Sequence, residues 1–124
     1  AEWAASDAVV LVTPCAFGGY AHEAKGVLDR TLGALLLPFF RRDAWGSRHR
    51  VRGAHAPAFG VLAAADPADD AGVATLRAVV ARNARNLDAP AHALALVPPE
   101  ASDDAARAAG DALVTALTPA LAHP

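Results

Sequence analysis

Three short, largely apolar runs, separated by longer segments of helical periodicity, constrain the fold of this chain most strongly. The runs are rich in β-branched and aliphatic residues and contain almost no polar interruption. Strands covered by helices on both faces have this pattern, whereas a strand with one face in water alternates polar and apolar residues. We therefore predict three parallel strands, at Ala8–Thr13, Ala58–Ala63 and His92–Val97.

The segments that follow these strands repeat apolar residues every three to four positions, as amphipathic helices do. Leu28 and Leu35 share one face in the first segment, and Leu76 and Val80 share one in the second. The third segment opens with Ser102, a residue type that caps helix N-termini, and continues with two aspartates near the positive end of the helix dipole. The order β-α-β-α-β-α with right-handed crossovers predicts a three-layer α/β sandwich around a parallel sheet.

The loop after the first strand carries two adjacent glycines and lies where a strand's carboxyl end meets a helix, a position at which open α/β folds bind ligands. Adjacent glycines let the backbone approach a flat ring and expose its N–H groups to the ring's polar edge. The alternative to ligand binding is a purely structural one, in which the glycines form a tight strand-to-helix turn and an aromatic side chain packs against it. In the ligand-binding interpretation, Phe17 or Tyr20 would lie against the ring.

The strand, this loop and the helix as far as Arg30 resemble the flavin-contacting segment of the NADPH-dependent FMN reductase and flavodoxin superfamily. The resemblance implies a flavodoxin-like sandwich with strand order 2-1-3-4-5, of which this chain supplies strands three, four and five. Strands one and two would lie upstream of Ala1. The chain contains no methionine, so we expect one domain over residues 1–124 that is amino-terminally truncated.

The same resemblance implies a flavin-dependent oxidoreductase that moves electrons from a nicotinamide, with NADPH as the expected donor, through FMN to an acceptor. The cofactor-binding residues that it implies are Thr13, Pro14, Cys15, Ala16, Phe17, Gly18, Gly19 and Tyr20. The cofactor carries such chemistry, so we expect no catalytic acid–base pair. Two alternatives stay open: an electron-transfer flavodoxin-like carrier, and a flavin-free scaffold or degenerate fragment. Acidic runs around the loop would favour the carrier, and the sequence has none there; the absence of a phosphate-binding loop favours the flavin-free protein.

Other reactive residue types give no pattern of a site. Cys15 is predicted to be a small, half-buried filler, because a reactive thiol needs a partner that lowers its pKa. The loop from Ala63 to Pro67 is predicted to be a plain connecting turn. The histidines lack metal-ligand spacing, so no metal site is expected and we interpret them as structural or solvent-exposed residues: His22, His49, His55, His92 and His123.

Residues 38–57 interrupt the regular pattern with half of the chain's arginines and several aromatic residues. Guanidinium groups match phosphates and stack on rings, so this insertion could grip a nicotinamide dinucleotide or line a partner subunit. A solvated, mobile loop fits the composition equally well. The residues concerned are Phe39, Phe40, Arg41, Arg42, Trp45, Arg48, His49, Arg50, Arg52 and His55.

Composition limits the partners and the compartment. A formal charge of −2 and a pI near 6.2 favour neither nucleic acid nor an anionic membrane as a partner. One cysteine allows no internal disulfide, and there is no apolar run of membrane-spanning length, so we expect a cytoplasmic protein. The partners that the family resemblance implies are flavin and nicotinamide nucleotides. The first strand would have an open edge, which predicts a homo-oligomer.

Overall fold

The computed structural model describes residues 2–44, 46–53 and 55–121 as a mixed α/β fold around a mostly parallel sheet. The central sheet has the strand order β2-β1-β5-β6, in which β1, β5 and β6 are parallel and β2 is antiparallel to β1. The three predicted strands are confirmed, the first with three additional residues. The strands are β1 (Ala8–Ala16), β2 (Gly19–Tyr20), β5 (Ala58–Ala64) and β6 (His92–Val97).

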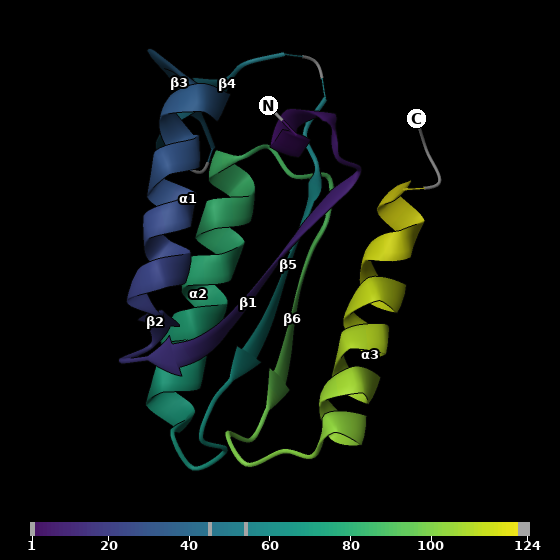
Figure 1. Cartoon of the computed structure of the whole chain (residues 1–124). Coiled ribbons are helices and arrows are strands. Elements are labelled where there is room, and N and C mark those ends of the chain that lie inside the picture. The colour runs from purple at the N-terminus through teal and green to yellow at the C-terminus, as the bar shows by residue number, and fades with distance from the viewer. Residues whose placement is uncertain (1, 45, 54, 122–124) are drawn as a thin grey trace.

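Helices cover both faces of this sheet. A short 3₁₀ helix, Glu2–Ala5, precedes β1. The helices α1 (His22–Leu35) and α2 (Asp70–Asn86) lie on one face, and α3 (Asp103–Leu121) lies on the other (Figure 1). The chain moves in one direction from β1 to β5 to β6, and right-handed crossovers in one direction put both connecting helices on the same face. The predicted cap of α3 is also confirmed, because Ser102 Oγ accepts a hydrogen bond from the Ala105 N–H at 3.2 Å.

Two apolar clusters hold the layers together. The larger one joins α1 and α2 to the sheet and includes Leu28, Phe59, Leu76 and Val80, all almost completely buried. The smaller one lies under α3, where a Cβ at Gly60 would stand 2.9 Å from a methyl carbon of Leu117. A glycine in β5 therefore lets α3 pack close to the sheet.

The outer part of β1 is less well covered. Val10 and Val12 point to the α3 face of the sheet but remain 41% and 73% exposed. β2 pairs with β1 only at Cys15 and Ala16. From Ala8 to Pro14, the side of β1 that faces away from β5 pairs with no described strand.

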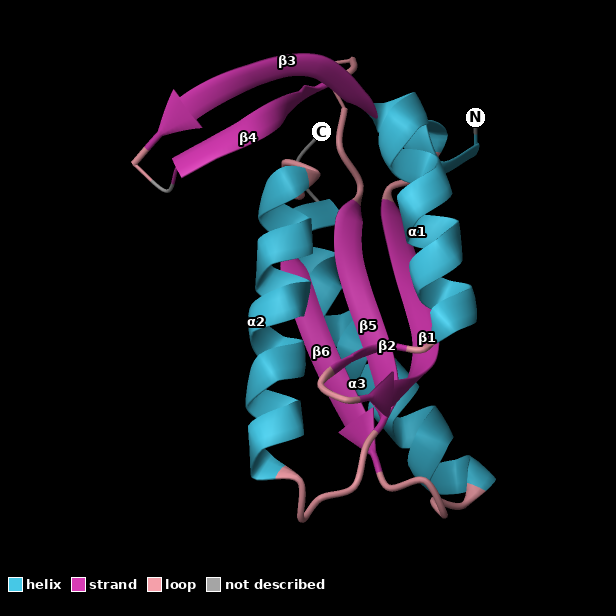
Figure 2. Cartoon of the chain, turned by 90° about the vertical axis from the view of Figure 1, so that its left-hand side faces the viewer, coloured by secondary structure: helices cyan, strands magenta, loops and turns pink. Residues whose placement is uncertain are grey.

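The arginine-rich insertion forms an antiparallel hairpin, which the sequence analysis did not predict. Its strands are β3 (Leu36–Asp43) and β4 (Gly46–Val51), and we call the hairpin the arm. It leaves the end of α1 and extends over the end of α2 (Figure 2). Its register shifts between Leu36 and Phe40, around Pro38, as expected because proline has no N–H for a ladder hydrogen bond. Most of the described residues of the insertion therefore lie in strands, in place of the loop that was one of the open alternatives; Trp45 lies outside the described residues.

Among the described residues, no helix has both the length and the apolar character needed to cross a membrane.

Candidate functional site

A tight hairpin replaces the predicted strand-to-helix turn at the carboxyl end of β1. β1 continues to Ala16, the chain reverses at Phe17 and Gly18, and β2 begins at Gly19. Both turn residues have positive φ, 51° at Phe17 and 77° at Gly18, as in the turns that match the twist of two-residue hairpins. Glycine adopts this conformation freely, but for phenylalanine it costs about 1–2 kcal/mol.

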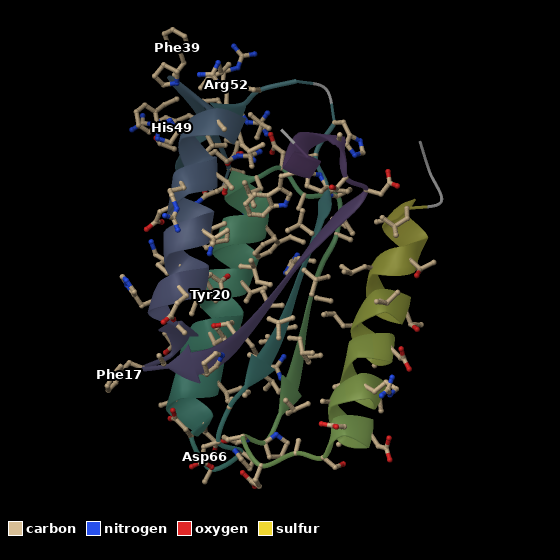
Figure 3. The ribbon with its side chains drawn as sticks, viewed as in Figure 1. Phe17, Tyr20, Phe39, His49, Arg52 and Asp66 are labelled. Atoms are coloured by element: carbon tan, nitrogen blue, oxygen red, sulfur yellow. The ribbon has the colours of Figure 1, made fainter. Side chains whose placement is uncertain are left out.

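The strained residue, Phe17, is also the most exposed aromatic side chain of the described chain. Its ring makes no contact that shields it from solvent, and its relative exposure is 107%. Figure 3 shows it pointing away from the body at the carboxyl end of the sheet. Backbone strain that the fold maintains at an exposed side chain is a feature of ligand-binding positions.

The remaining candidate residues divide between surface and interior. Pro14 and Ala16 are exposed, and Gly19 is half-buried. Gly18 is buried, since a Cβ there would lie 2.7 Å from Thr75 Cβ on α2. Cys15 is half-buried and packs against the larger apolar cluster, which agrees with its predicted role as a filler.

Two of the predicted binding residues use their polar groups within the protein. The Thr13 hydroxyl is buried; it accepts a hydrogen bond from the Ala21 N–H at 3.0 Å and so fixes the chain at the start of α1. The Tyr20 hydroxyl accepts a hydrogen bond from Asn83 Nδ2 at 3.0 Å. Burial raises the pKa of Tyr20 above 10.0, an effect that this hydrogen bond partly offsets. Of the two aromatic residues suggested for the ring, only Phe17 faces solvent.

Acidic residues surround the same end of the sheet, contributed by the loops after β5 and β6 and by the first turns of α2 and α3. All six are exposed, and none forms an ion pair with a described residue. These residues form no acidic run in the sequence because they come from separate segments. We call them the acidic rim: Asp66, Asp69, Asp70, Glu100, Asp103 and Asp104.

The residues at this end fit one part of FMN and not another. Phe17 and the adjacent glycine backbone provide a surface for the flat ring. A phosphate needs N–H groups at a helix N-terminus or cationic side chains. Here the first turns of α1, α2 and α3 each carry acidic residues. At this end of the sheet, the described residues therefore offer an aromatic surface for a flat ring, whereas the acidic residues at the three helix N-termini disfavour a phosphate.

The arm lies at the opposite end of the sheet from the hairpin. Phe39, His49 and Arg52 mark one end of the molecule in Figure 3, and Phe17 and Asp66 mark the other. The strands between them, such as the seven-residue β5, span roughly 23 Å at 3.3 Å per residue. Within one chain, the arm's arginines therefore do not reach a ligand at Phe17.

The arm is attached to the end of α2 by ion pairs. Asp88 has a φ of 54° just after α2, and its N–H and that of Ala89 bond to the carbonyls of Arg85 and Ala84, which is a Schellman C-cap. The Asp88 carboxylate pairs with Arg41, at 3.1 Å, and with Arg48. Arg48 also donates to the Arg85 carbonyl at 2.6 Å, which puts a cation at the negative end of the helix.

The histidines are spread over the fold. No cluster of three or more metal-ligating side chains occurs among residues 2–44, 46–53 and 55–121. His49 stacks on Phe40 with ring centroids 4.3 Å apart, and His55 contacts the Ser6 carbonyl. His123 lies outside the described residues. Comparisons of the chain with protein-family models, with curated proteins and with solved structures found no significant match.

Proposed function

We propose that the chain is a flavodoxin-like domain of an FMN-dependent oxidoreductase of the NADPH-dependent FMN reductase type. The observation that carries the proposal is the hairpin after β1, which holds Phe17 in a strained, fully exposed position at the carboxyl end of a parallel sheet. Ligands of open α/β folds bind at this end of the strands.

The strand order supports the flavodoxin-like part of the proposal. β1, β5 and β6 are parallel, and they lie side by side in the order in which they occur along the chain. Strands three, four and five have the same arrangement in the flavodoxin-like strand order 2-1-3-4-5. In that order strand one pairs with strand three, and the corresponding side of β1 has no described partner from Ala8 to Pro14.

The proposed roles of the residues follow from their exposure. Phe17 lies against the ring, and the backbone of the half-buried Gly19 approaches its polar edge, whereas Gly18 is buried against Thr75 and shapes the turn. Bound at these residues, FMN would supply the redox chemistry that carries electrons from a nicotinamide to an acceptor. Thr13 and Tyr20 hold the hairpin in place through Ala21 and Asn83. NADPH as donor and a cytoplasmic location belong to the same proposal.

The acidic rim favours a second candidate function, an electron-transfer carrier. Six exposed carboxylates around the hairpin repel the phosphates of FMN and NADPH and attract a cationic protein partner. A carrier receives electrons from, and delivers them to, proteins, and it needs no nicotinamide site.

Flavin titration tests the proposal. Riboflavin and FMN should bind weakly and with similar affinity, because only the ring contributes, and Phe17→Ala should weaken both. The matched control is Phe39→Ala, which removes an exposed aromatic ring from the arm. Phe17→Ala binding flavin as well as the wild type would refute the proposed site. Sub-micromolar binding of FMN alone would reveal a phosphate site outside the described residues.

Turnover separates the two functions. With FMN bound, a reductase oxidises NADPH. A carrier does not, but after chemical reduction it reduces a cationic haem protein such as cytochrome c, and added salt slows the transfer.

A further inference from the structure

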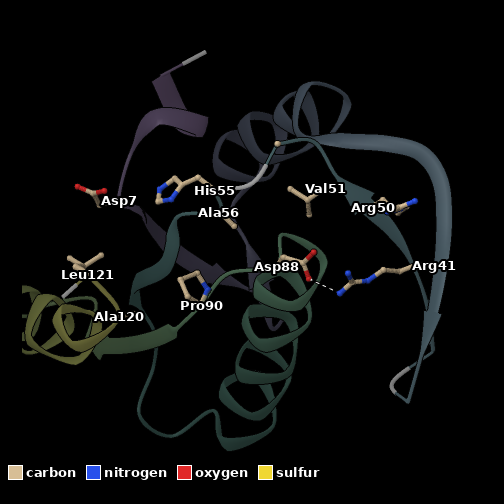
Figure 4. A pocket seen from close by; sticks show the side chains of 11 residues that line it. Asp7, Arg41, Arg50, Val51, His55, Ala56, Asp88, Pro90, Ala120 and Leu121 are labelled. Atoms are coloured by element: carbon tan, nitrogen blue, oxygen red, sulfur yellow. Dashed lines mark hydrogen bonds and ion pairs between the residues drawn. The ribbon is translucent and has the colours of Figure 1, made fainter. Parts of the chain in front are cut away.

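We propose that the protein has a second binding site, for a small anion with an apolar body such as a medium-chain or aryl carboxylate. The site is a cavity of about 790 Å³ between the arm, the amino ends of the central strands and the end of α3 (Figure 4). Cavities of roughly 300–1,000 Å³ are typical of small-molecule sites. This one lies at the opposite end of the sheet from Phe17, so it does not depend on the proposed flavin function.

The arm contributes the cationic wall of the cavity. Arg41 and Arg50 line it from β3 and β4. Arg41 shares Asp88 with Arg48, so one carboxylate faces two guanidinium groups. Arg50 is exposed and has no ion pair or hydrogen bond with a described residue. Its guanidinium is therefore available to a carboxylate, which arginine binds through two parallel hydrogen bonds.

The strand that carries Arg50 is held in place before a ligand arrives. Arg48 is nine-tenths buried, with a side-chain exposure of 11%, and ties β4 to both Asp43 and Asp88. Asp88 in turn belongs to the C-cap of α2. Because the strand is already fixed, only the side chain of Arg50 has to become ordered on binding, which limits the entropy cost.

The opposite wall is apolar and sets the orientation of the ligand. Pro90, Ala120 and Leu121 line the cavity beside the end of α3. Asp7 lies on this side, next to His55, and repels an anion from it. The anionic group of the ligand therefore lies toward Arg50, and its apolar body lies against the α3 side.

Paired probes test the site in the intact chain. The anionic probe is 1-anilinonaphthalene-8-sulfonate, and N-phenyl-1-naphthylamine is its uncharged counterpart. Arg50→Gln should weaken binding of the anionic probe by at least about tenfold, the effect of losing one of its two charge-assisted hydrogen bonds, and leave the uncharged probe unchanged. Arg42→Gln is the matched control, because Arg42 lies on the arm, bonds to Ser47 and does not line the cavity.

Two further measurements locate the probe and identify the ligand class. Ala120→Phe should block both probes, because Ala120 lines the cavity and is only half-buried, so a larger side chain can project into the space. Octanoate should displace the anionic probe from the wild type, and octanol should do so much less. Thermal unfolding of each variant checks that the fold is intact. No binding of the anionic probe, or equal binding by the wild type and Arg50→Gln, would overturn the proposal.

Discussion

Replacement of Asp88 separates the two energetic roles that this residue has at the end of α2. As the residue that follows the C-cap Leu87, Asp88 has a φ of 54°, a conformation that glycine would adopt at about 1 kcal/mol less cost. As the partner of Arg41 and Arg48, it anchors the arm. The two contributions have opposite signs when Asp88 is replaced by glycine.

Anchoring of the arm affects stability more than the backbone conformation of Asp88 does. Without the carboxylate, Arg48 stays largely buried with one charge partner fewer, which costs about 1.5–3 kcal/mol. The Arg41 pair adds less than about 1 kcal/mol, because the Arg41 side chain is 46% exposed. Asp88→Ala should therefore lower the free energy of unfolding by about 2–3 kcal/mol, and Asp88→Gly by only about 1–2 kcal/mol, since glycine adopts the positive φ without strain.

Urea unfolding measures these differences, and amide hydrogen exchange shows where they act. Both variants should exchange the arm's amide hydrogens faster than the wild type, while β5 and β6 keep their protection. Asp88→Asn keeps a residue type that tolerates positive φ and removes the charge, so it isolates the ion pairs. If Asp88→Gly were as stable as the wild type and the arm's exchange unchanged, the anchoring role would be wrong.

Three further predictions concern the sheet and its hairpin. Gly18→Ala should destabilise the fold by about 2–4 kcal/mol, because its Cβ would meet Thr75 and its φ is positive. Gly19→Ala, whose Cβ has only a 3.6 Å contact, should cost under about 1 kcal/mol, and urea unfolding measures both values. The free energy of unfolding should fall as pH rises above 10.0, because Tyr20 then ionises in the unfolded chain and stays protonated in the folded one. Tyr20→Phe removes the only tyrosine and should abolish this contribution to the pH dependence; an unchanged pH dependence would contradict the prediction. Val12→Lys should reduce self-association in sedimentation experiments by charging an exposed strand face beside an open edge, and equal association of both proteins would exclude this surface.

The regular part of the fold could be predicted because its signal is local. The apolar runs at Ala58 and His92 and the periodic positions of Leu76 and Val80 reflect burial on both faces of a sheet and on one face of a helix. The arm could not be predicted in this way. Its position depends on contacts such as Arg48 with Asp88, 40 residues apart in sequence, and its strands are largely exposed.

The candidate site could be predicted in location but not in detail. The loop at Thr13–Tyr20 lies at the expected end of the sheet, yet a hairpin that reverses at a phenylalanine with positive φ has no common sequence signal. The burial of Tyr20 depends on Asn83, 63 residues away. The acidic rim could have been found by grouping acidic residues that follow parallel strands, because the carboxyl ends of such strands meet at one edge.

Mapping of amide chemical shifts during riboflavin titration tests the proposed flavin site most directly. Riboflavin carries no phosphate, so its shifts report the ring alone. We expect the shifts to concentrate at Ala16, Phe17 and Gly19, with smaller changes at Asp66 on the rim, and none on the arm. Shifts confined to the arm around Arg41, or no saturable shifts at Phe17, would contradict a flavin site at the carboxyl end of the sheet.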